Sequence, residues 1–438
     1  MLETLRNAFK IKDIRKKLFY TFMMLVVVRL GSQLPVPGVN RDYFSNWFAS
    51  QQSNGAFNFF SAFTGGSFER MSIFALNITP YITSSIIMQL LTIAIPKLEE
   101  MHRDGEEGRK KIQTITRYLT VGLALFESVA MAIGFGKSGL IEDMNVLSVL
   151  TVVAALTAGS AFLMWVGERI TENGVGNGIS IVLMINILSR VPQDIATLVD
   201  TFVRGKSVAH GALAALIIIA VIVVTVILVI LLNDATRKIP VQYAKKMQGR
   251  KLVGGQSSCI PLKVNTAGVI PVIFASSLMS IPQIVMAFVQ KSASGVGATI
   301  LGMLNQNNWF NFKEPIYSVG LILYIVLIIF FAYFYTSITF NPIEVADNIK
   351  KQGGFIPGIR PGKPTTDYLN KILGYVVFLG AVGLTIVVLI PVFFNGVFGA
   401  SVSFGGTSII IIVGVILETL KQIESQMLVR NYRGFLSE

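Results

Sequence analysis

Long apolar runs separated by polar connections dominate the pattern of this chain. A transmembrane helix needs about 20 mainly apolar residues, so the pattern predicts an all-α membrane protein with ten transmembrane helices. The first run has no small-residue cleavage site and continues into Pro35-Val36-Pro37-Gly38, so we expect a retained span rather than a cleaved signal peptide. The runs cover residues 18–34, 73–95, 118–135, 146–166, 179–191, 208–232, 267–289, 316–338, 372–394 and 407–428.

Composition and the placement of charge support a multi-pass membrane protein. Of 438 residues, 53% are hydrophobic and 14% are charged, which excludes a water-soluble domain. The net charge of +13 is compatible with nucleic-acid binding, but alternate connections hold most of the 37 lysines and arginines. Because basic connections stay in the cytoplasm, this distribution predicts an even number of spans and cytoplasmic termini at both ends.

The sequence contains no pattern typical of a catalytic or metal site. One cysteine, Cys259, excludes an internal disulfide framework and a CxxC cluster, and the two histidines, His102 and His210, leave little for zinc or haem. Neither HExxH, GxSxG nor a Walker loop is present. We therefore expect no catalytic residue, no metal, no cofactor and no enzymatic activity.

Ten spans with a cytoplasmic amino terminus divide into two halves of five, residues 1–200 and 201–438, which enter the membrane from opposite sides. The second span of each half contains a Pro-x-Ile sequence followed by a serine pair. A lone proline in a span is more often a packing kink, whereas matched prolines in two halves favour a functional site. The matching residues are Pro80, Ile82, Ser84 and Ser85 in the first half, and Pro271, Ile273, Ser276 and Ser277 in the second.

Residues 57–68, which precede the second span, fit no simple loop. The segment is rich in phenylalanine, serine and glycine, so it is too polar to span and too aromatic to stay in water. One interpretation is an amphipathic helix at the membrane interface. The other is a short re-entrant element, made mobile by its glycines, that folds back among the spans. Periodicity does not choose between them.

Two predicted cytoplasmic loops, 233–265 and 339–371, are long and basic. For most of their lysines, lipid-facing charge that sets topology is a sufficient explanation. Arg360 differs, because it lies within Gly358-Ile359-Arg360-Pro361-Gly362, where glycines and prolines predict a tight turn that presents one arginine as a docking contact. The basic loop 97–117 also contains acids and is interpreted as a solvated surface.

Ionisable residues within spans are functional candidates, because they are costly in lipid. Arg29 and Glu127 meet this description. Arg29 either snorkels or pairs locally, or has a direct role; the sequence leaves this open. No series of acids crosses the membrane, so no proton relay is evident, which argues against an ion-coupled pump.

Five motifs follow one another along the chain, and with them the sequence, from Ile11 to its last residues, resembles the SecY family, the pore-forming subunits of the bacterial Sec protein-translocation channel. Agreement of five motifs in the expected order is very improbable by chance. The motifs are residues 74–82 (FALNITPYI), 172–180 (ENGVGNGIS), 267–271 (AGVIP), 358–362 (GIRPG) and 404–408 (FGGTS).

The resemblance implies a central hourglass pore between two pseudo-symmetric, inverted halves that are hinged after the fifth span. It places a plug at about residues 57–70 and an aliphatic ring at the waist of the pore. Leu183 stands where isoleucine is commonest in the family, which changes shape slightly and polarity not at all. The implied plug residues are Ser61, Ala62, Phe63, Thr64, Gly65 and Gly66, and the implied ring residues are Ile78, Ile82, Ile179, Leu183, Ile273 and Ile411.

The resemblance also implies a lateral gate, docking loops and partners. Glu127 and Asn265 match polar gate positions, and we place Ile86 and Leu278 on the seam between spans two and seven. Arg250 and Arg360 would dock the SecA motor or the ribosome. The SecE and SecG subunits would complete the complex in the bacterial cytoplasmic membrane. Signal peptides and secretory or membrane proteins would be its substrates, with lateral release of membrane segments into lipid.

An inverted-repeat secondary transporter of a small solute explains the repeat and the kinked helices equally well. Such a carrier has no use for two long docking loops, and it needs polar ligands at the midplane, where this chain has aliphatic residues. An intramembrane protease is improbable, because the HExxH, Ser/His and paired-Asp patterns are missing.

Overall fold

A computed structural model describes most of the chain. The described residues are 6, 9–50, 64–136, 141, 145–203, 208–243, 246–248, 251–253, 257–289, 296–310, 315–398 and 406–434. Every predicted apolar run coincides with a helix in this structure. These helices are α2 (Lys12–Gly31), α5 (Thr79–Ala94), α7 (Gly105–Phe135), α8 (Val146–Asn173), α9 (Gly178–Phe202), α10 (Val208–Asp234), α11 (Ile270–Val289), α13 (Ser318–Thr339), α15 (Lys363–Phe398) and α16 (Gly406–Gly434).

Shorter helices lie in the connections. They are α3 (Arg41–Ser50), α6 (Pro96–Arg103), α12 (Val296–Leu304) and α14 (Pro342–Lys351). In the described part of the chain, 6 helices are long and apolar enough to cross a membrane, and 7 if α5 and α6, bent by 107°, form one span. A total of ten crossings therefore stays a prediction.

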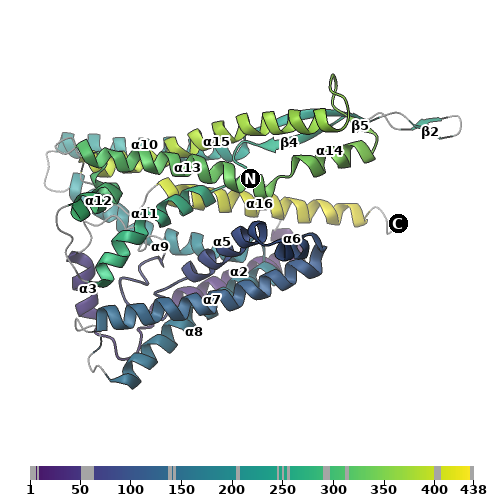
Figure 1. Cartoon of the computed structure of the whole chain (residues 1–438). Helices are drawn as coiled ribbons and strands as arrows, with labels where there is room; N and C mark the ends of the chain where they lie inside the picture. Colours follow the sequence, from purple (N-terminus) through teal and green to yellow (C-terminus); the bar gives the residue numbers. More distant parts are fainter. Residues whose placement is uncertain are drawn as a thin grey trace.

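The two halves of the chain share one packing scheme (Figure 1). In the first half α5 packs on α7, α7 on α8, α8 on α9, and α2 on both α8 and α9. In the second half α11 packs on α13, α13 on α15, α15 on α16, and α10 on both α15 and α16. The second set follows from the first by replacing each helix with the one at the same place in the other half. This correspondence is what an inverted repeat predicts.

Helices of the two halves contact one another at several places. α9 contacts α10 and α16, and α7 contacts α11. Ile14 of α2 and Ile423 of α16 also belong to one buried cluster. In Figure 1 the first half, purple to teal, and the second half, teal to yellow, diverge toward the end of the molecule where α3 and α12 lie, and α9 and α10 are drawn fainter, so they lie farther from the viewer than α7 and α11.

The two predicted docking loops fold together into one small unit. Strands β1 (Thr236–Tyr243), β4 (Ser257–Lys263) and β5 (Gly354–Phe355) form a sheet in the order β4-β1-β5, with Ile239 opposite Ile260. A separate hairpin pairs β2 (Lys246–Gln248) with β3 (Lys251–Val253). The sequence analysis expected only loops here. Buried and exposed positions alternate on β1, so Ile239 and Val241 share one apolar core with residues of α14. A prediction from local sequence does not include this contact between two distant connections.

The predicted loop 97–117 is mostly helical, and most of its residues are exposed, as expected of a solvated surface. It comprises α6 and the first turns of α7, so the helix of the third run begins at Gly105 rather than near residue 118. Lys110 pairs with Glu106, and Lys111 pairs with Glu107. Each pair joins two exposed residues that are one helical turn apart. Such pairs stabilise a helix in water, so α7 extends beyond its apolar part.

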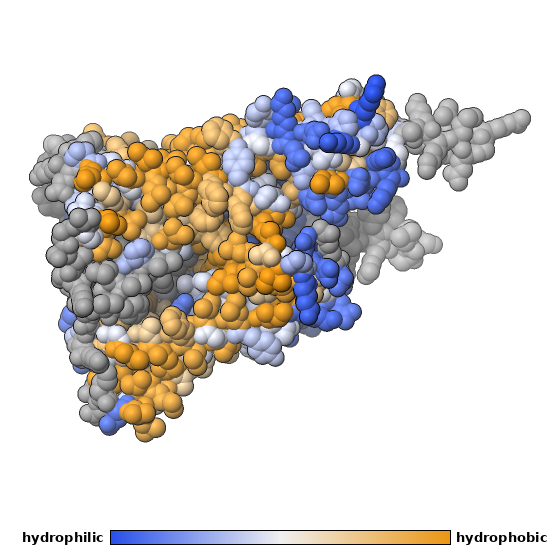
Figure 2. Space-filling view, in the orientation of Figure 1, coloured by the Kyte–Doolittle hydropathy of each residue, from blue (hydrophilic) through white to orange (hydrophobic). Residues whose placement is uncertain are grey.

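Polar and apolar surface separate along the molecule. Figure 2 shows hydrophobic residues over most of the visible helical surface, and hydrophilic residues gathered at the end where α14, β4 and β5 lie. An apolar belt of this kind is the surface that a bilayer covers. The polar end carries the small sheet and Arg360.

Candidate functional site

The starts of α5 and α11 have the same local geometry. Asn77 and Gly268, each three residues before a proline, have φ angles of 52° and 62°. In the first half the amides of Tyr81 and Ile82 both donate to the Ile78 carbonyl, and the corresponding amides of the second half both donate to the Val269 carbonyl. Pro80 and Pro271 are each the second residue of their helix. The prolines therefore lie at the starts of two helices and do not kink the middle of a span.

All six residues assigned to the aliphatic ring belong to one apolar cluster in the structure. Ile78, Leu183 and Ile411 are buried, with exposed fractions of 0%, 7% and 4%. The other three are partly buried and pack against the same cluster. They are Ile82, Ile179 and Ile273. The six come from the beginning of α5, from α9, α11 and α16, and so from both halves of the chain.

The start of α9 is defined by the 172–180 motif. The Asn177 side chain accepts hydrogen bonds from the amides of Ile179 and Ser180, at 3.1 and 3.4 Å, and so caps the helix. A Cβ at Gly178 would lie 1.9 Å from the Gly167 carbonyl oxygen, so only glycine allows this close approach of α9 to α8. Ile179 and Leu183 are one turn apart and lie on the same side of α9.

Part of the predicted plug segment lies against α9. Ser61, Ala62 and Phe63 fall outside the described residues. Thr64 is buried, and Gly65 and Gly66 have φ angles of 61° and 80°. The backbone of Gly65 lies so near the Asn186 carbonyl that an added Cβ would be 2.6 Å from its oxygen. Residues 64–66 therefore approach the middle of α9 closely.

The same segment is tied to α9 by an ion pair that the sequence analysis missed. Arg190 Nη1 of α9 lies 2.9 Å from Glu69 Oε2, and Arg190 Nε lies 3.8 Å from Asp194 Oδ1. Arg190 and Asp194 are buried, with exposed fractions of 5% and 6%. Arg190 stands at the very end of a predicted span, so its burial was not visible from the hydrophobic pattern.

The residues assigned to the lateral gate do not form one contact group. Glu127 is partly buried on α7, the helix that contacts α11. Asn265 donates from Nδ2 to Asn233 Oδ1, 2.9 Å away at the end of α10, and so bonds within the second half. Ile86 is partly buried on α5, and Leu278 on α11 is 48% exposed. Their role at a gate stays a prediction.

Arg360 lies on a rigid turn, whereas Arg250 falls outside the described residues. Gly358 and Gly362 flank Arg360 with φ angles of 82° and 106°, which favour glycine, and Thr365 Oγ1 donates to the Arg360 carbonyl at 2.9 Å. Ile359 packs into the apolar core of the small sheet unit. Arg360 itself is exposed, and none of the described carboxylates lies within ion-pair distance of it.

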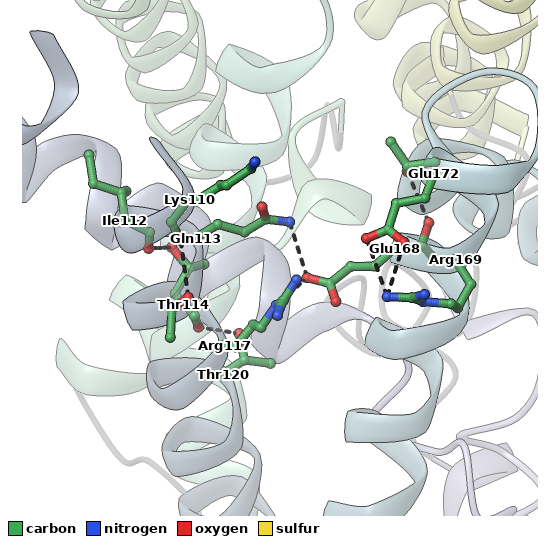
Figure 3. A network of polar contacts seen from close by, with 12 residues as sticks. Lys110, Ile112, Gln113, Thr114, Arg117, Thr120, Glu168, Arg169 and Glu172 are labelled. Atoms are coloured by element: carbon green, nitrogen blue, oxygen red, sulfur yellow. Dashed lines mark hydrogen bonds and ion pairs between the residues drawn. The ribbon is translucent and has the colours of Figure 1, made fainter. Parts of the chain in front are cut away.

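A second polar group that the sequence analysis missed links α7 to α8 (Figure 3). Glu168 Oε1 accepts hydrogen bonds from Arg117 Nε at 2.6 Å and from Gln113 Nε2 at 3.2 Å. Glu168 is 6% exposed. The predicted span ended at residue 166, whereas α8 continues to Asn173, so Glu168 was assigned to a loop instead of to the helix interface.

Arg29, which the sequence left open, gains no partner among the described side chains. It lies in the last turn of α2, and its Nη1 atom is buried without a hydrogen-bond partner. Neither local pairing nor a direct role is therefore demonstrated. As for metals, no group of three His, Cys, Asp or Glu side chains able to hold an ion occurs among the residues searched.

Comparison with protein families identifies the chain. A model of the SecY family matches residues 72–420. The chain belongs to the SecY family. The protein translocase subunit SecY of Streptomyces scabiei is 45% identical and that of Halalkalibacterium halodurans 44% identical, each match covering 100% of both chains. The protein translocase subunit SecY of Staphylococcus aureus is 41% identical over 99% of both chains.

Solved SecY-family structures share the fold. A structure described as a protein conducting channel matches with a TM-score of 0.61 and 18% identity, covering 94% of this chain and 93% of that one. Sec61 in the canine ribosome-channel complex matches with a TM-score of 0.58 and 17% identity, covering 94% and 93%. At such identities the likeness establishes the architecture alone.

Proposed function

We propose that this chain is the protein-conducting channel of a bacterial translocase. It passes unfolded secretory polypeptides across the membrane and releases apolar segments sideways into lipid. The observation that carries the proposal is the convergence of Ile78, Ile82, Ile179, Leu183, Ile273 and Ile411, from both halves, in one apolar cluster. Full-length relatives named protein translocase subunit SecY support it.

The aliphatic ring is the permeability seal of the proposed pore. A narrow apolar collar dewets when it is empty and so opposes ions with a desolvation barrier. Flexible aliphatic side chains also retract around substrate side chains of different size, and they make no directional bonds that would hold the passing backbone. A small-solute transporter needs polar ligands at this place, so it is the weaker alternative.

Residues of the 57–70 segment act as the plug on the external side of the ring. Support comes from the described residues of this segment, which approach α9 at Gly65 and pair with it through Glu69 and Arg190. The re-entrant interpretation of the segment is therefore preferred to an interfacial helix.

The chain is a channel rather than a catalyst, so partners supply the energy of transport. The unit formed by β1, β4, β5 and α14 is the docking platform for the SecA motor and the ribosome, with Arg360 at its tip. Relatives have been solved in ribosome-bound complexes. SecE and SecG complete the complex. The excess of basic residues in alternate connections supports a cytoplasmic location for this platform and for both chain termini.

The seam between α5 and α7 on one side and α11 and α13 on the other is the lateral gate. A hinge at the contact between α9 and α10 lets the two halves move apart. The support is the pattern of contacts between the halves, which pairs α9 with α10 and α16 on one side and α7 with α11 on the other.

Photocrosslinking tests the channel directly. A photoreactive residue is placed at Ile82 or Ile273 of the reconstituted complex, and a secretory precursor is arrested in transit by a bulky carboxyl-terminal group. We expect crosslinks to the arrested precursor at both positions. The control position is Phe22 on α2, which is 62% exposed on the outer surface. Crosslinks at Phe22 but not at the ring positions would contradict a central path.

A further inference from the structure

The turns before α5 and α11 share their backbone path but differ in how they are held. Among the described residues, Gly268 has no atom within 4 Å of the position that a Cβ would occupy, so the space that a side chain would fill there is open. Asn77, at the same place in the first half, is 1% exposed and has a φ angle of 52°. Asparagine tolerates this left-handed conformation better than most residues but less well than glycine. We therefore expect contacts with neighbouring residues that compensate for the conformational cost of asparagine at position 77.

Two hydrogen bonds from neighbouring helices provide that contact. Asn186 Nδ2 of α9 donates to Asn77 Oδ1 at 3.0 Å, and Ser160 Oγ of α8 donates to the Asn77 carbonyl at 3.1 Å. Asn186 and Ser160 are buried, with exposed fractions of 3% and 1%. A buried amide that loses its partner is costly, so these bonds hold the turn in one conformation.

The braced turn leads directly into the ring. Ile78 follows Asn77, is 0% exposed, and its carbonyl accepts the first hydrogen bonds of α5. A shift of the Asn77 backbone therefore moves the Ile78 side chain and the start of the helix that carries Ile82. Asn186 also lies against Gly65, so the same residue of α9 contacts the segment before the second span and the turn before the ring.

We propose that Asn77 is a positioning residue for the seal. Its bonds to Asn186 and Ser160 hold Ile78 in the closed ring, whereas Gly268 at the equivalent turn has no side chain to make such a bond. This proposal rests on the proposed function, because it assumes that the aliphatic ring is the seal. It predicts an asymmetric ring, in which the contribution of the first half is held by side-chain hydrogen bonds and that of the second half is not.

A double-mutant cycle measures this bond in the resting channel. Asn77→Gly removes the side chain and leaves a residue that favours the left-handed φ of 52°, and Asn186→Ala removes the donor without changing the sequence of the turn. We expect each variant to raise the ion conductance of the resting complex in planar bilayers about tenfold, as the loss of one buried hydrogen bond suggests. The double variant is expected to be no leakier than either single variant, because both remove the same bond.

Two controls separate positioning from general damage. Gly268→Asn makes the equivalent turn resemble the first, and is expected to leave resting conductance unchanged. A leak of equal size in Gly268→Asn, or additive effects in the cycle, would overturn the proposal. The yield and thermal midpoint of the assembled complex are measured in parallel, and a tight Asn186→Ala variant with normal yield would also overturn it.

Ile78→Gly distinguishes failure of this proposal from failure of the seal. A leak in Ile78→Gly with tight Asn77→Gly and Asn186→Ala channels would retain the ring and reject the positioning role of Asn77. Tight channels in all three variants would reject both, and would place the seal outside the ring.

Discussion

The ring side chains differ in exposure, although they share one chemical character. Ile78, Leu183 and Ile411 are buried, whereas Ile82, Ile179 and Ile273 are partly exposed and pack against the cluster. Ile82 and Ile273 occupy the same Pro-x-Ile position in the two halves. Pseudo-symmetry therefore makes this pair the one to change together.

Replacing Ile82 and Ile273 with serine is expected to open the resting channel to ions. Hydroxyl groups hydrate a collar that dewets when it is apolar, so conductance in planar bilayers should rise by about tenfold or more. If these isoleucines only pack one helix against another, the double variant will be less stable but equally tight. A correctly assembled, ion-tight double variant would place the seal elsewhere, with the plug as the first candidate.

Glu168 provides a prediction about stability. Glu168→Gln removes the charge that Arg117 and Gln113 contact, so the α7–α8 interface should weaken by about 1 kcal/mol, a modest value because the Arg117 side chain is 39% exposed. We expect a lower thermal midpoint of the purified complex. Lys110→Ala is the matched control, since its pair with Glu106 is 72% and 86% exposed and should contribute little. Equal midpoints for Glu168→Gln and the parent would contradict this assignment.

At the scale of elements, two segments far apart in sequence build one platform. The hairpin of β1 and β4 pairs with β5 from the other connection, and α14 packs its buried Ala346 and Ile349 against it. The Ile359 side chain packs in the same core, while Arg360 is exposed and its always-charged guanidinium forms no ion pair with a described acid. An exposed cation on a rigid turn suits recognition of a partner's carboxylates.

Arg360→Glu is expected to block motor-driven export and leave the amount of channel in the membrane unchanged. Reversal of the charge turns an attractive contact into a repulsive one, while the glycines that shape the turn stay in place. Export of a secretory precursor into inverted vesicles, with SecA and ATP, measures the effect. Lys363→Glu, three residues away and also exposed, is the control for charge alone. Normal export by the Arg360 variant would transfer the role to Arg250 and its neighbours.

At the scale of the whole molecule, the two halves are joined on one side and touch across another. The joined side contains α9, α10 and α16, and the opposite side contains the α7–α11 contact. Such an arrangement permits opening by rotation about the joined side, as in hinged domain movements. An apolar signal segment could then leave the pore sideways and partition into lipid.

Linking the halves across the seam is expected to stop export. Cysteines replace Ile86 on α5 and Leu278 on α11, after Cys259, the exposed free cysteine, is changed to serine. A short bismaleimide then joins them, and each single-cysteine variant receives the same reagent as a control. Precursor export should fall to background only in the joined pair. Unimpeded export by fully crosslinked channels would refute lateral opening as a requirement for transport.

Hydrophobic pattern alone located each of the ten apolar helices to within a few residues at most ends. A run of apolar side chains is a local property of the sequence, and burial in lipid or in the protein core stabilises it. The matched prolines indicated a shared feature of the two halves, and the structure shows that both lie at helix starts. The errors lie at the ends of helices, where exposed ion pairs extend α7 and where α8 continues past Glu168. Hydropathy does not register these residues, because they are stabilised in water or by a partner on another helix.

Tertiary packing was needed for everything that depends on residues distant in sequence. Motif resemblance named the ring residues, but only the fold brings Ile78 and Ile411 into one cluster across more than three hundred positions. The joining of β1 with β5 and the pairing of Arg190 with Glu69 also arise between distant segments. The Asn77–Asn186 bond is of the same kind: the sequence contains both asparagines, and only the approach of α9 to the turn before α5 makes them partners.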